Sequence, residues 1–129
     1  GKPLAVCWDG EPAGTTALED TAILEMAGID AKLIREEEAD TARQAGAGQI
    51  LFLARQDMDF APGAGRMDAK FARQLLSGGK VSGDAARLLA QAAEQVERGL
   101  PRAAVIDQRR PHALLLYLLG RDVPAVTVE

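Results

Sequence analysis

Short apolar segments alternate along this chain with longer segments in which apolar residues recur at helical spacing. The clearest apolar segment is QILFLA at residues 49–54, a continuous run that is typical of a strand covered on both faces of a sheet. RAAVID at residues 102–107 has the same character. We therefore expect these two segments to be central, parallel strands. Further strands are expected at residues 3–8, 29–34 and 123–128.

Helical segments separate these strands. In the first of them, Thr16 as N-cap and Glu19 three residues later predict a capping box, and Gly28 predicts the end of the helix. Its apolar residues are expected to share one face toward the core: Leu18, Ala22, Ile23 and Met26. Residues 35–48 are polar, then helix-prone, then glycine-rich, and residues 55–67 are expected to be a loop. Three more helices are expected at residues 68–78, 82–99 and 111–119.

The order of these elements predicts the fold class. It runs strand, helix, strand, helix, strand, then two helices, and finally strand, helix, strand. Alternation of this kind is typical of a mainly parallel sheet that lies between layers of helices. The sequence therefore predicts an α/β fold, a three-layer sandwich, which residues 1–129 form as a single domain.

Composition and charge narrow the classes of function. The chain has 129 residues, 47% hydrophobic content and a formal net charge of −4. A globular protein is expected, and a nucleic-acid partner is not, because such proteins usually carry a clustered basic face. Cys7 is the only cysteine and His112 the only histidine, so we expect a cytoplasmic location and no metal site of His and Cys ligands. No apolar run approaches the roughly 20 residues that a membrane span requires, so no membrane partner is expected.

A glycine-rich segment, SGGKVSG at residues 77–83, precedes the expected helix at 82–99. It lacks the first glycine of the Walker phosphate-binding pattern, and Val81 stands where that pattern has a hydroxyl residue after the lysine. The free N–H groups of the helix N-terminus at Ser82 and Asp84 can still bind an anion. From these residues alone, a plain turn between two helices is the favoured interpretation.

Three other features have a less specific chemistry. REEEAD at residues 35–40 holds four carboxylates, for which a solvated charged run is favoured over a Mg²⁺ or general-base role. Asp107 ends an expected strand, where α/β sheets bind ligands, but aspartate is equally common there as a turn residue. Cys7 lies within an apolar strand and is expected to be a buried thiol rather than a nucleophile.

His112 is the remaining candidate for catalysis. Pro111 is expected at the first helical position, which places His112 in the first turn of a buried helix. No serine or cysteine nucleophile pattern accompanies it. A structural role for His112 is therefore favoured.

The segment AAVIDQRRPHALLLYLLGRDVPAVTV at residues 103–128 resembles the C-terminal end of the acetylglutamate kinases, within the amino acid kinase superfamily. In that family a strand ends in Ile-Asp-Gly-Arg, Pro-His-Ala-Leu-Leu-Leu opens a helix, and a Gly-Thr strand follows. Residues 76–107 resemble the family's Ser-Gly-Gly-Met loop with its helix and strand. EADTA at 38–42 resembles Asn-Ala-Asp-Thr-Ala, and residues 16–34 and 49–57 resemble the elements around that motif. Nearly the whole chain thus resembles, in order, the second half of such a kinase.

The resemblance implies transfer of the γ-phosphoryl group of ATP to the side-chain carboxylate of N-acetylglutamate, with ATP and Mg²⁺ as cofactors. It implies that Asp40 organises the catalytic lysines and that the Pro-His helix is structural. It assigns Ser82 and Gly83 to the phosphate loop and matches Asp57 to the aspartate that follows the strand at 49–54. Lys80, two residues before the loop, is a candidate to supply positive charge.

Some residues depart from the family pattern. Asp84 and Ala85 stand where the family loop has Gly-Met, Leu88 aligns with a later family lysine, and the glycine-rich first strand has no counterpart. Because phosphoryl transfer requires positive charge around the phosphates, we expect weak or no binding of Mg-ATP and no transfer by this chain alone.

Two classes of function remain open. One is a kinase completed by a missing N-terminal half, upstream of Gly1, or by a partner chain. The other is a non-catalytic module that binds a ligand or another protein. Either is expected to form oligomers, most simply a homodimer, because half of such a fold leaves sheet edges and apolar faces to cover.

Overall fold

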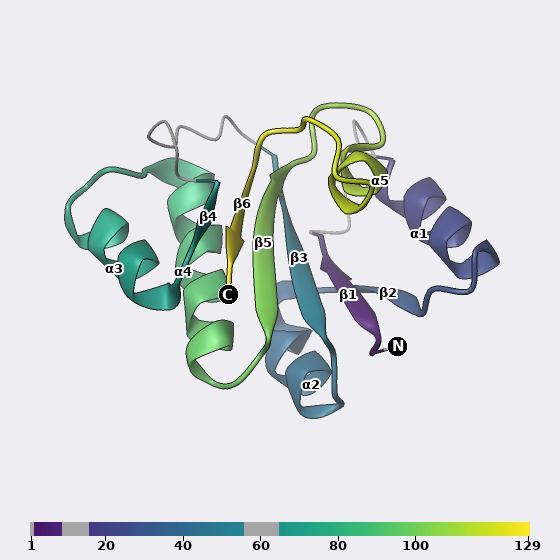
Figure 1. The fold of residues 1–129 in the computed structure, drawn as a ribbon, viewed down its shortest axis with the longest axis horizontal. Helices are drawn as coiled ribbons and strands as arrows, with labels where there is room; N and C mark the ends of the chain where they lie inside the picture. Colours follow the sequence, from purple (N-terminus) through teal and green to yellow (C-terminus); the bar gives the residue numbers. More distant parts are fainter. Residues whose placement is uncertain (1, 9–15, 56–64) are drawn as a thin grey trace.

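The computed structural model describes residues 2–8, 16–55 and 65–129, which form one six-stranded sheet with helices on both faces (Figure 1). The strands are β1 (Leu4–Cys7), β2 (Ala31–Ile34), β3 (Gln49–Ala54), β4 (Arg66–Met67), β5 (Arg102–Asp107) and β6 (Ala125–Val128). The helices are α1 (Ala17–Met26), η1 (Glu36–Glu38, a 3-10 turn), α2 (Ala39–Gln44), α3 (Ala69–Ser77), α4 (Gly83–Glu97) and α5 (Ala113–Leu118). No helix in the described part of the chain is both long and apolar enough to cross a membrane.

β3 and β5 form the centre of the sheet, whose strand order is β2-β1-β3-β5-β6-β4. They pair in parallel over their whole length, from Gln49 opposite Arg102 to Ala54 opposite Asp107. β1 and β2 continue the parallel arrangement on one side. On the other side β6 runs antiparallel to β5, and β4 pairs in parallel with β6. The prediction of a mainly parallel, three-layer α/β fold around these two central strands is therefore confirmed.

The two faces of the sheet pack against different helices. Figure 1 shows α3 and α4 on one side of the sheet and α1 and α5 on the other. Alternate side chains of β3 belong to two different hydrophobic cores, one on each face of the sheet. Ile50 and Phe52 pack with α3 and α4, whereas Leu51 and Leu53 pack with α1 and α5. All of these side chains are buried, as the continuous apolar run predicts for a strand with helices on both sides.

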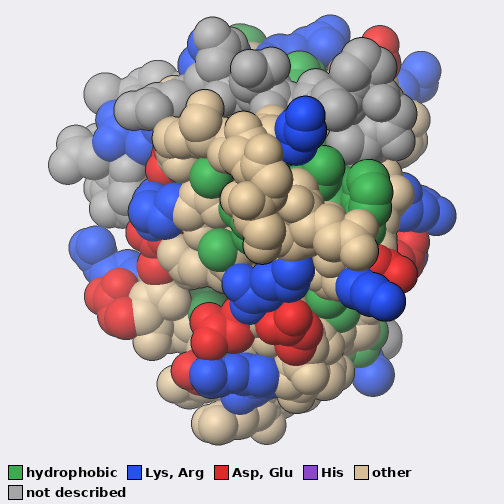
Figure 2. Space-filling model, turned by 90° about the vertical axis from the view of Figure 1, so that its left-hand side faces the viewer, with side chains coloured by type: hydrophobic (Ala, Val, Ile, Leu, Met, Phe, Trp, Pro, Cys, Tyr) green, Lys and Arg blue, Asp and Glu red, His purple; other side chains and the backbone are tan. Residues whose placement is uncertain are grey.

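The outward surface of α3 and α4 carries charge of both signs, and positive and negative side chains lie next to each other on it in Figure 2. Arg73 of α3 pairs with Glu97 of α4 at 2.8 Å, and Arg98 pairs with Glu94 at 2.8 Å. Exposed pairs of this kind contribute about 0–1 kcal/mol each. The packing of these two helices on the sheet therefore depends on buried apolar side chains such as Leu89.

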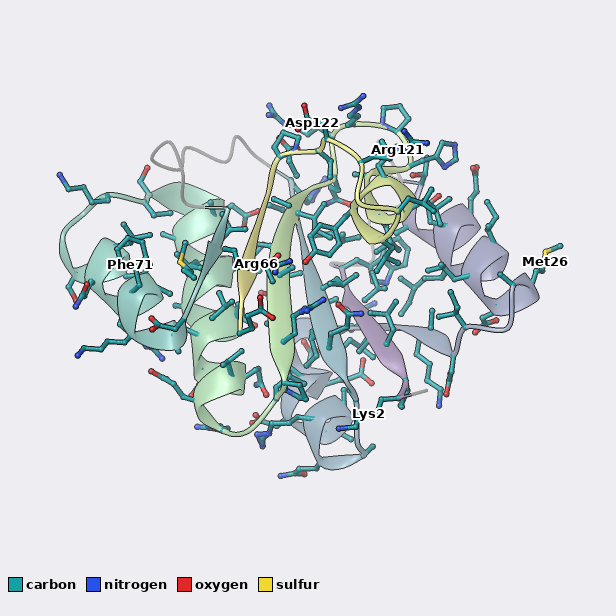
Figure 3. The ribbon with its side chains drawn as sticks, in the orientation of Figure 1. Lys2, Met26, Arg66, Phe71, Arg121 and Asp122 are labelled. Atoms are coloured by element: carbon teal, nitrogen blue, oxygen red, sulfur yellow. The ribbon has the colours of Figure 1, made fainter. Side chains whose placement is uncertain are left out.

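Helix α1 turns a different face to the core from the one that its apolar pattern predicts. Its buried residues are Ala17, Asp20, Thr21 and Leu24. The residues predicted to face inward are exposed instead, by 54% for Leu18, 46% for Ile23 and 87% for Met26. Met26 points away from the molecule at the end of α1 in Figure 3. The polar residues tolerate burial because they are hydrogen-bonded; the Thr21 hydroxyl, for example, donates to the carbonyl of Ala17 at 2.8 Å.

Two further local predictions are wrong. Thr16 is the N-cap of α1, but its side chain makes no capping bond and donates instead to Asp20 Oδ2 at 3.2 Å. The segment 55–67, expected to be a loop, contains the short strand β4. This strand forms because β6 offers a free edge, along which Thr127 N–H donates to the carbonyl of Gly65 at 2.9 Å.

Two phenylalanines allow the packing of the layers to be tested. Phe52 in β3 is fully buried, and Phe71 on α3 is 45% exposed. We expect Phe52→Ala to lower the free energy of unfolding by about 3–5 kcal/mol, because it leaves a cavity between the sheet and its helices. Phe71→Ala is the matched control and should cost less than about 1 kcal/mol. Urea denaturation measures both values, and equal losses would contradict this description of the core.

Candidate functional site

The carboxyl ends of β1 and β3 mark the point at which the chain leaves the sheet in two directions. From β1 the chain passes through α1 to β2 on one side, and from β3 it passes through the edge strand β4 and then α3 and α4 to β5 on the other. Ligands of open α/β sheets bind in the crevice at such a point. A pocket lies here, and we name it the switch-point pocket. Its lining residues are Cys7, Trp8, Glu36, Leu53, Arg55, Asp84, Arg87 and Leu88.

The first turn of α4 supplies a negative charge to this pocket. Ser82 is the N-cap residue, and Gly83 has a φ of 64°, which glycine adopts without strain. The carboxylate of Asp84 accepts the backbone N–H of Arg55, the residue that follows β3, at 3.0 Å. It also binds the guanidinium of Arg87 at 2.5 Å. An acidic side chain in the first turn complements the helix dipole, so the chain provides its own anion at this helix N-terminus.

A second carboxylate belongs to the same network. Glu36 of η1 binds the guanidinium of Arg87 and accepts a hydrogen bond from Gln91, one turn further along α4. Arg87 is 52% exposed and is held between Glu36 and Asp84. Its positive charge is therefore already paired twice before any ligand arrives.

The space left in the switch-point pocket is small. It measures about 20 Å³, which is room for about one water molecule, whereas small-molecule sites occupy roughly 300–1,000 Å³. Cys7, at the end of β1, is 2% exposed. Burial, together with the charge of Glu36, raises the pKa of its thiol to about 12. The thiol is therefore protonated at neutral pH, and the prediction that Cys7 is a buried thiol is confirmed.

The structure brings together only some of the site residues predicted from sequence. Ser82 and Gly83 directly precede Asp84 and form the start of α4 beside the switch-point pocket. Lys80 is exposed in the turn between α3 and α4. Asp57 lies outside the described residues.

Asp40 lies toward the opposite end of α4. Its carboxylate accepts a hydrogen bond from Gln95 at 2.9 Å and binds Arg98 at 3.3 Å. Gln95 is near the last turn of this 15-residue helix, so about 18 Å of helix separates it from the first turn. The hydrogen bond from Gln95 and the charge of Arg98 hold the pKa of Asp40 below its usual value. The predicted catalytic carboxylate and the predicted phosphate loop therefore do not share a site.

Asp107 acts as a turn residue at the end of β5. Its carboxylate accepts the backbone N–H of Arg109 at 3.0 Å and binds the guanidinium of the same residue at 2.7 Å. This interaction with Arg109 lowers the pKa of Asp107. Of the two interpretations left open by the sequence, the geometry fits the turn residue, and Asp107 does not line the switch-point pocket.

A polar cluster that the sequence did not reveal joins α1 to the turn before α5. Nδ1 of His112 lies 2.7 Å from Oδ1 of Asp20, and the backbone N–H of His112 donates to the hydroxyl of Thr16 at 2.8 Å. The side chain of Asp20 is 1% exposed, whereas that of His112 is 46% exposed. A buried carboxylate therefore holds the ring of a partly exposed histidine.

The conformation of His112 differs from the prediction. It is the N-cap residue of α5, so the helix begins at Ala113 and not at Pro111. Its φ of 59° is left-handed, a conformation that residues other than glycine adopt rarely and with strain. The bonds to α1 oppose this strain. These bonds join residues more than 90 positions apart in the sequence. The sequence indicates the burial of Asp20 only through its helical spacing from Ala17 and Leu24, which place all three residues on the same face of α1.

We expect the His112–Asp20 pair to stabilise the folded protein at low pH, and we expect this contribution to be lost as the pH rises above about 6.5. The hydrogen bond to Asp20, followed by its charge, raises the pKa of His112 in the folded state. The contribution of the pair is therefore complete below about pH 6.5, the usual value for an unfolded chain, and is lost as the pH rises through the higher folded value. Urea denaturation from about pH 5 to 9 measures it. His112→Gln should remove this part of the pH dependence, and an unchanged profile would contradict the prediction.

Within the described residues, no three His, Cys, Asp or Glu side chains come together in the way that a metal ion requires. No family model matches the chain, and no curated protein matches its sequence. A functional proposal therefore depends on the switch-point geometry and on the resemblance of the motifs.

Proposed function

We propose that this chain is an acetylglutamate kinase-like domain, of the amino acid kinase superfamily, that does not transfer phosphate by itself and acts as a non-catalytic binding or interaction module. The observation that carries the proposal is the position of Asp84. Its carboxylate accepts the N–H of Arg55 at 3.0 Å in the first turn of α4, beside the residues that resemble the phosphate loop.

The electrostatics at this helix N-terminus support the proposal. A phosphate oxygen within about 4 Å of the Asp84 carboxylate would be repelled by about 4 kcal/mol per pair of unit charges near a protein surface. The N–H groups of a helix N-terminus attract an anion by only about 1 kcal/mol. The repulsion exceeds the attraction of the N–H groups, and the guanidinium of Arg87 offsets only part of it because Asp84 shares this one positive charge with Glu36.

The positive charge that phosphoryl transfer requires is also reduced. Leu88, which aligns with a family lysine, is 2% exposed and lines the switch-point pocket as an apolar side chain. Arg87 beside it is bound by Asp84 and Glu36. Because catalysis of this kind depends on positive charge around the phosphates, ATP and Mg²⁺ are not expected to be working cofactors of the chain alone.

The exposed apolar residues of α1 support the interaction part of the proposal. Leu18, Ile23 and Met26 present large apolar side chains to solvent on one helix, and Ile29, 44% exposed, follows shortly after it. The surface of α3 and α4 in Figure 2 is instead rich in paired charges. A single apolar helix face is self-complementary across a twofold axis. The α1 face is therefore proposed to pack against the α1 face of a second copy.

Calorimetric titration with Mg-ATP tests whether the N-terminus of α4 binds phosphate groups. We expect no binding by the unmodified chain, or a Kd weaker than about 1 mM. Asp84→Gly restores the family's glycine and removes the charge, so it should lower the Kd by about tenfold or more. Glu94→Gln removes a negative charge further along α4 and is the matched control, which should bind like the unmodified chain.

Two results would change this proposal. Micromolar binding of Mg-ATP by the unmodified chain would contradict it and favour a kinase completed by a further chain. Absence of binding by both the unmodified chain and the Asp84→Gly variant would remove the nucleotide from the proposal and leave the interaction module.

Analytical ultracentrifugation tests the α1 interface. At a protein concentration of about 50 µM we expect a dimer. Changing both Ile23 and Met26 to Glu should give a monomer, because it places charges in the proposed contact. Phe71→Glu changes an apolar residue of similar exposure on α3 and should leave the dimer intact. A monomeric unmodified chain at this concentration would exclude the interface.

A further inference from the structure

The face of the sheet that packs against α1 and α5 is only partly covered. α5 has six residues and a length of about 9 Å, whereas β5, also of six residues, is about 20 Å long. Helix α5 packs on the carboxyl half of β5, where Ile106 joins Leu114 in the core. The remaining part borders a groove of about 390 Å³, which we name the β5–β6 groove. Its polar lining residues include Gln49, Arg66, Arg102, Tyr117, Arg121 and Thr127.

The strand register places several of these polar side chains on one face of the sheet. Gln49 of β3 lies opposite Arg102 of β5, and Arg66 of β4 lies opposite Thr127 of β6. Side chains of directly opposed residues point to the same side of a sheet. The residues that follow them in sequence belong to the core beneath α3 and α4, so these four face the groove.

A carboxylate already occupies the positive end of the β5–β6 groove. Oε1 of Glu129 lies 3.1 Å from Nε of Arg66, and its Oε2 accepts a hydrogen bond from Nη2 of Arg102 at 3.1 Å. The spacing of these two guanidinium groups therefore fits a carboxylate. Arg66 is 72% exposed and Arg102 is 42% exposed. Exposed pairs of this kind contribute about 1 kcal/mol or less each, so an external carboxylate can displace Glu129.

The floor and the far rim of the groove add further groups for recognition. The hydroxyls of Tyr117 and Thr127 lie 2.6 Å apart, so one donates to the other and leaves a proton for an acceptor. Arg121 also lines the groove and makes no ion pair within the described ranges. Figure 3 shows Arg66 over the central strands and Arg121 at the loop after α5.

We propose that the β5–β6 groove binds a small dicarboxylate. One carboxylate of the ligand takes the place of Glu129 between Arg66 and Arg102, and the second pairs with Arg121. The carbon chain between them lies over the hydroxyl groups of the floor. The amino ends of β3 and β5 border this groove, whereas the switch-point pocket lies at the carboxyl ends of β1 and β3. The proposal is therefore independent of the proposed function.

Succinate is the probe for this site. It is titrated into ¹⁵N-labelled protein while ¹H–¹⁵N spectra record the backbone and arginine Nε–H signals. We expect saturable shifts with a Kd of about 1 mM or lower. Arg102→Gln and Arg121→Gln should each raise the Kd by about tenfold or more, because each removes a charged hydrogen-bond donor. Glu129→Gln removes the internal competitor and should lower the Kd by about threefold or more.

Matched controls separate this site from general charge effects. Arg73→Gln removes an exposed, paired arginine on α3 and should leave the Kd unchanged. Succinamide, which is neutral, and acetate, with one carboxylate, should bind about tenfold more weakly or worse. Tighter binding of inorganic phosphate than of succinate would overturn the dicarboxylate assignment. The absence of saturable shifts up to about 50 mM succinate, or unchanged affinity in a folded Arg102→Gln variant, would overturn the site itself.

Discussion

The parallel pairing of β3 with β5 is the interaction on which the rest of the structure depends. Both strands are buried from their second residue to their last, because helices cover much of both faces of the sheet at this point. The pair joins β1 and β2, which run parallel to it, to β6 and β4 on the other side. The carboxyl end of β3 borders the switch-point pocket, and the amino ends of both strands form part of the floor of the β5–β6 groove. A substitution that shifts this register would therefore disturb both sites together.

In both sites, a carboxylate of the chain itself binds groups that could otherwise bind an anionic ligand. At the switch-point pocket, Asp84 in the first turn of α4 binds the N–H of Arg55 and the guanidinium of Arg87. At the β5–β6 groove, Glu129 binds the guanidinium groups of Arg66 and Arg102. A tethered carboxylate loses less translational freedom on binding than a free anion does, so each internal group has an entropic advantage over a ligand. The difference lies in what surrounds them. Asp84 is bound by a backbone N–H and a doubly paired guanidinium, whereas Glu129 is bound by two exposed side chains.

The sequence predicted the central strands and the fold class because a continuous apolar run determines burial largely by itself. It failed where burial depends on a distant partner. Asp20 is buried where His112 and Thr16 bind it, and the apolar residues on the opposite face of α1 are exposed to solvent. Likewise, Arg66–Met67 becomes a strand only because β6 has a free edge beside it.

The candidate site was predictable only in part for a similar reason. Ser82, Gly83 and Asp84 are contiguous, and the turn that they form before α4 is visible in the sequence. The position of Asp40 relative to them depends on the path of the chain through η1 and the short helix α2. This path places Asp40 against Gln95, near the end of α4. A motif can therefore keep its order in the sequence while its members lie in separate places.

The short strands at the two edges of the sheet have a consequence for how this chain behaves in a crowded solution. β4 has only two residues, and β2 has four and carries the exposed charge of Lys32. Short and charged edges offer few unpaired backbone groups to which a strand of another molecule can add. Addition of strands from other molecules, as in amyloid-like growth, is therefore disfavoured at both edges of the sheet. The apolar side chains exposed on α1 lie on a helix and provide no such edge.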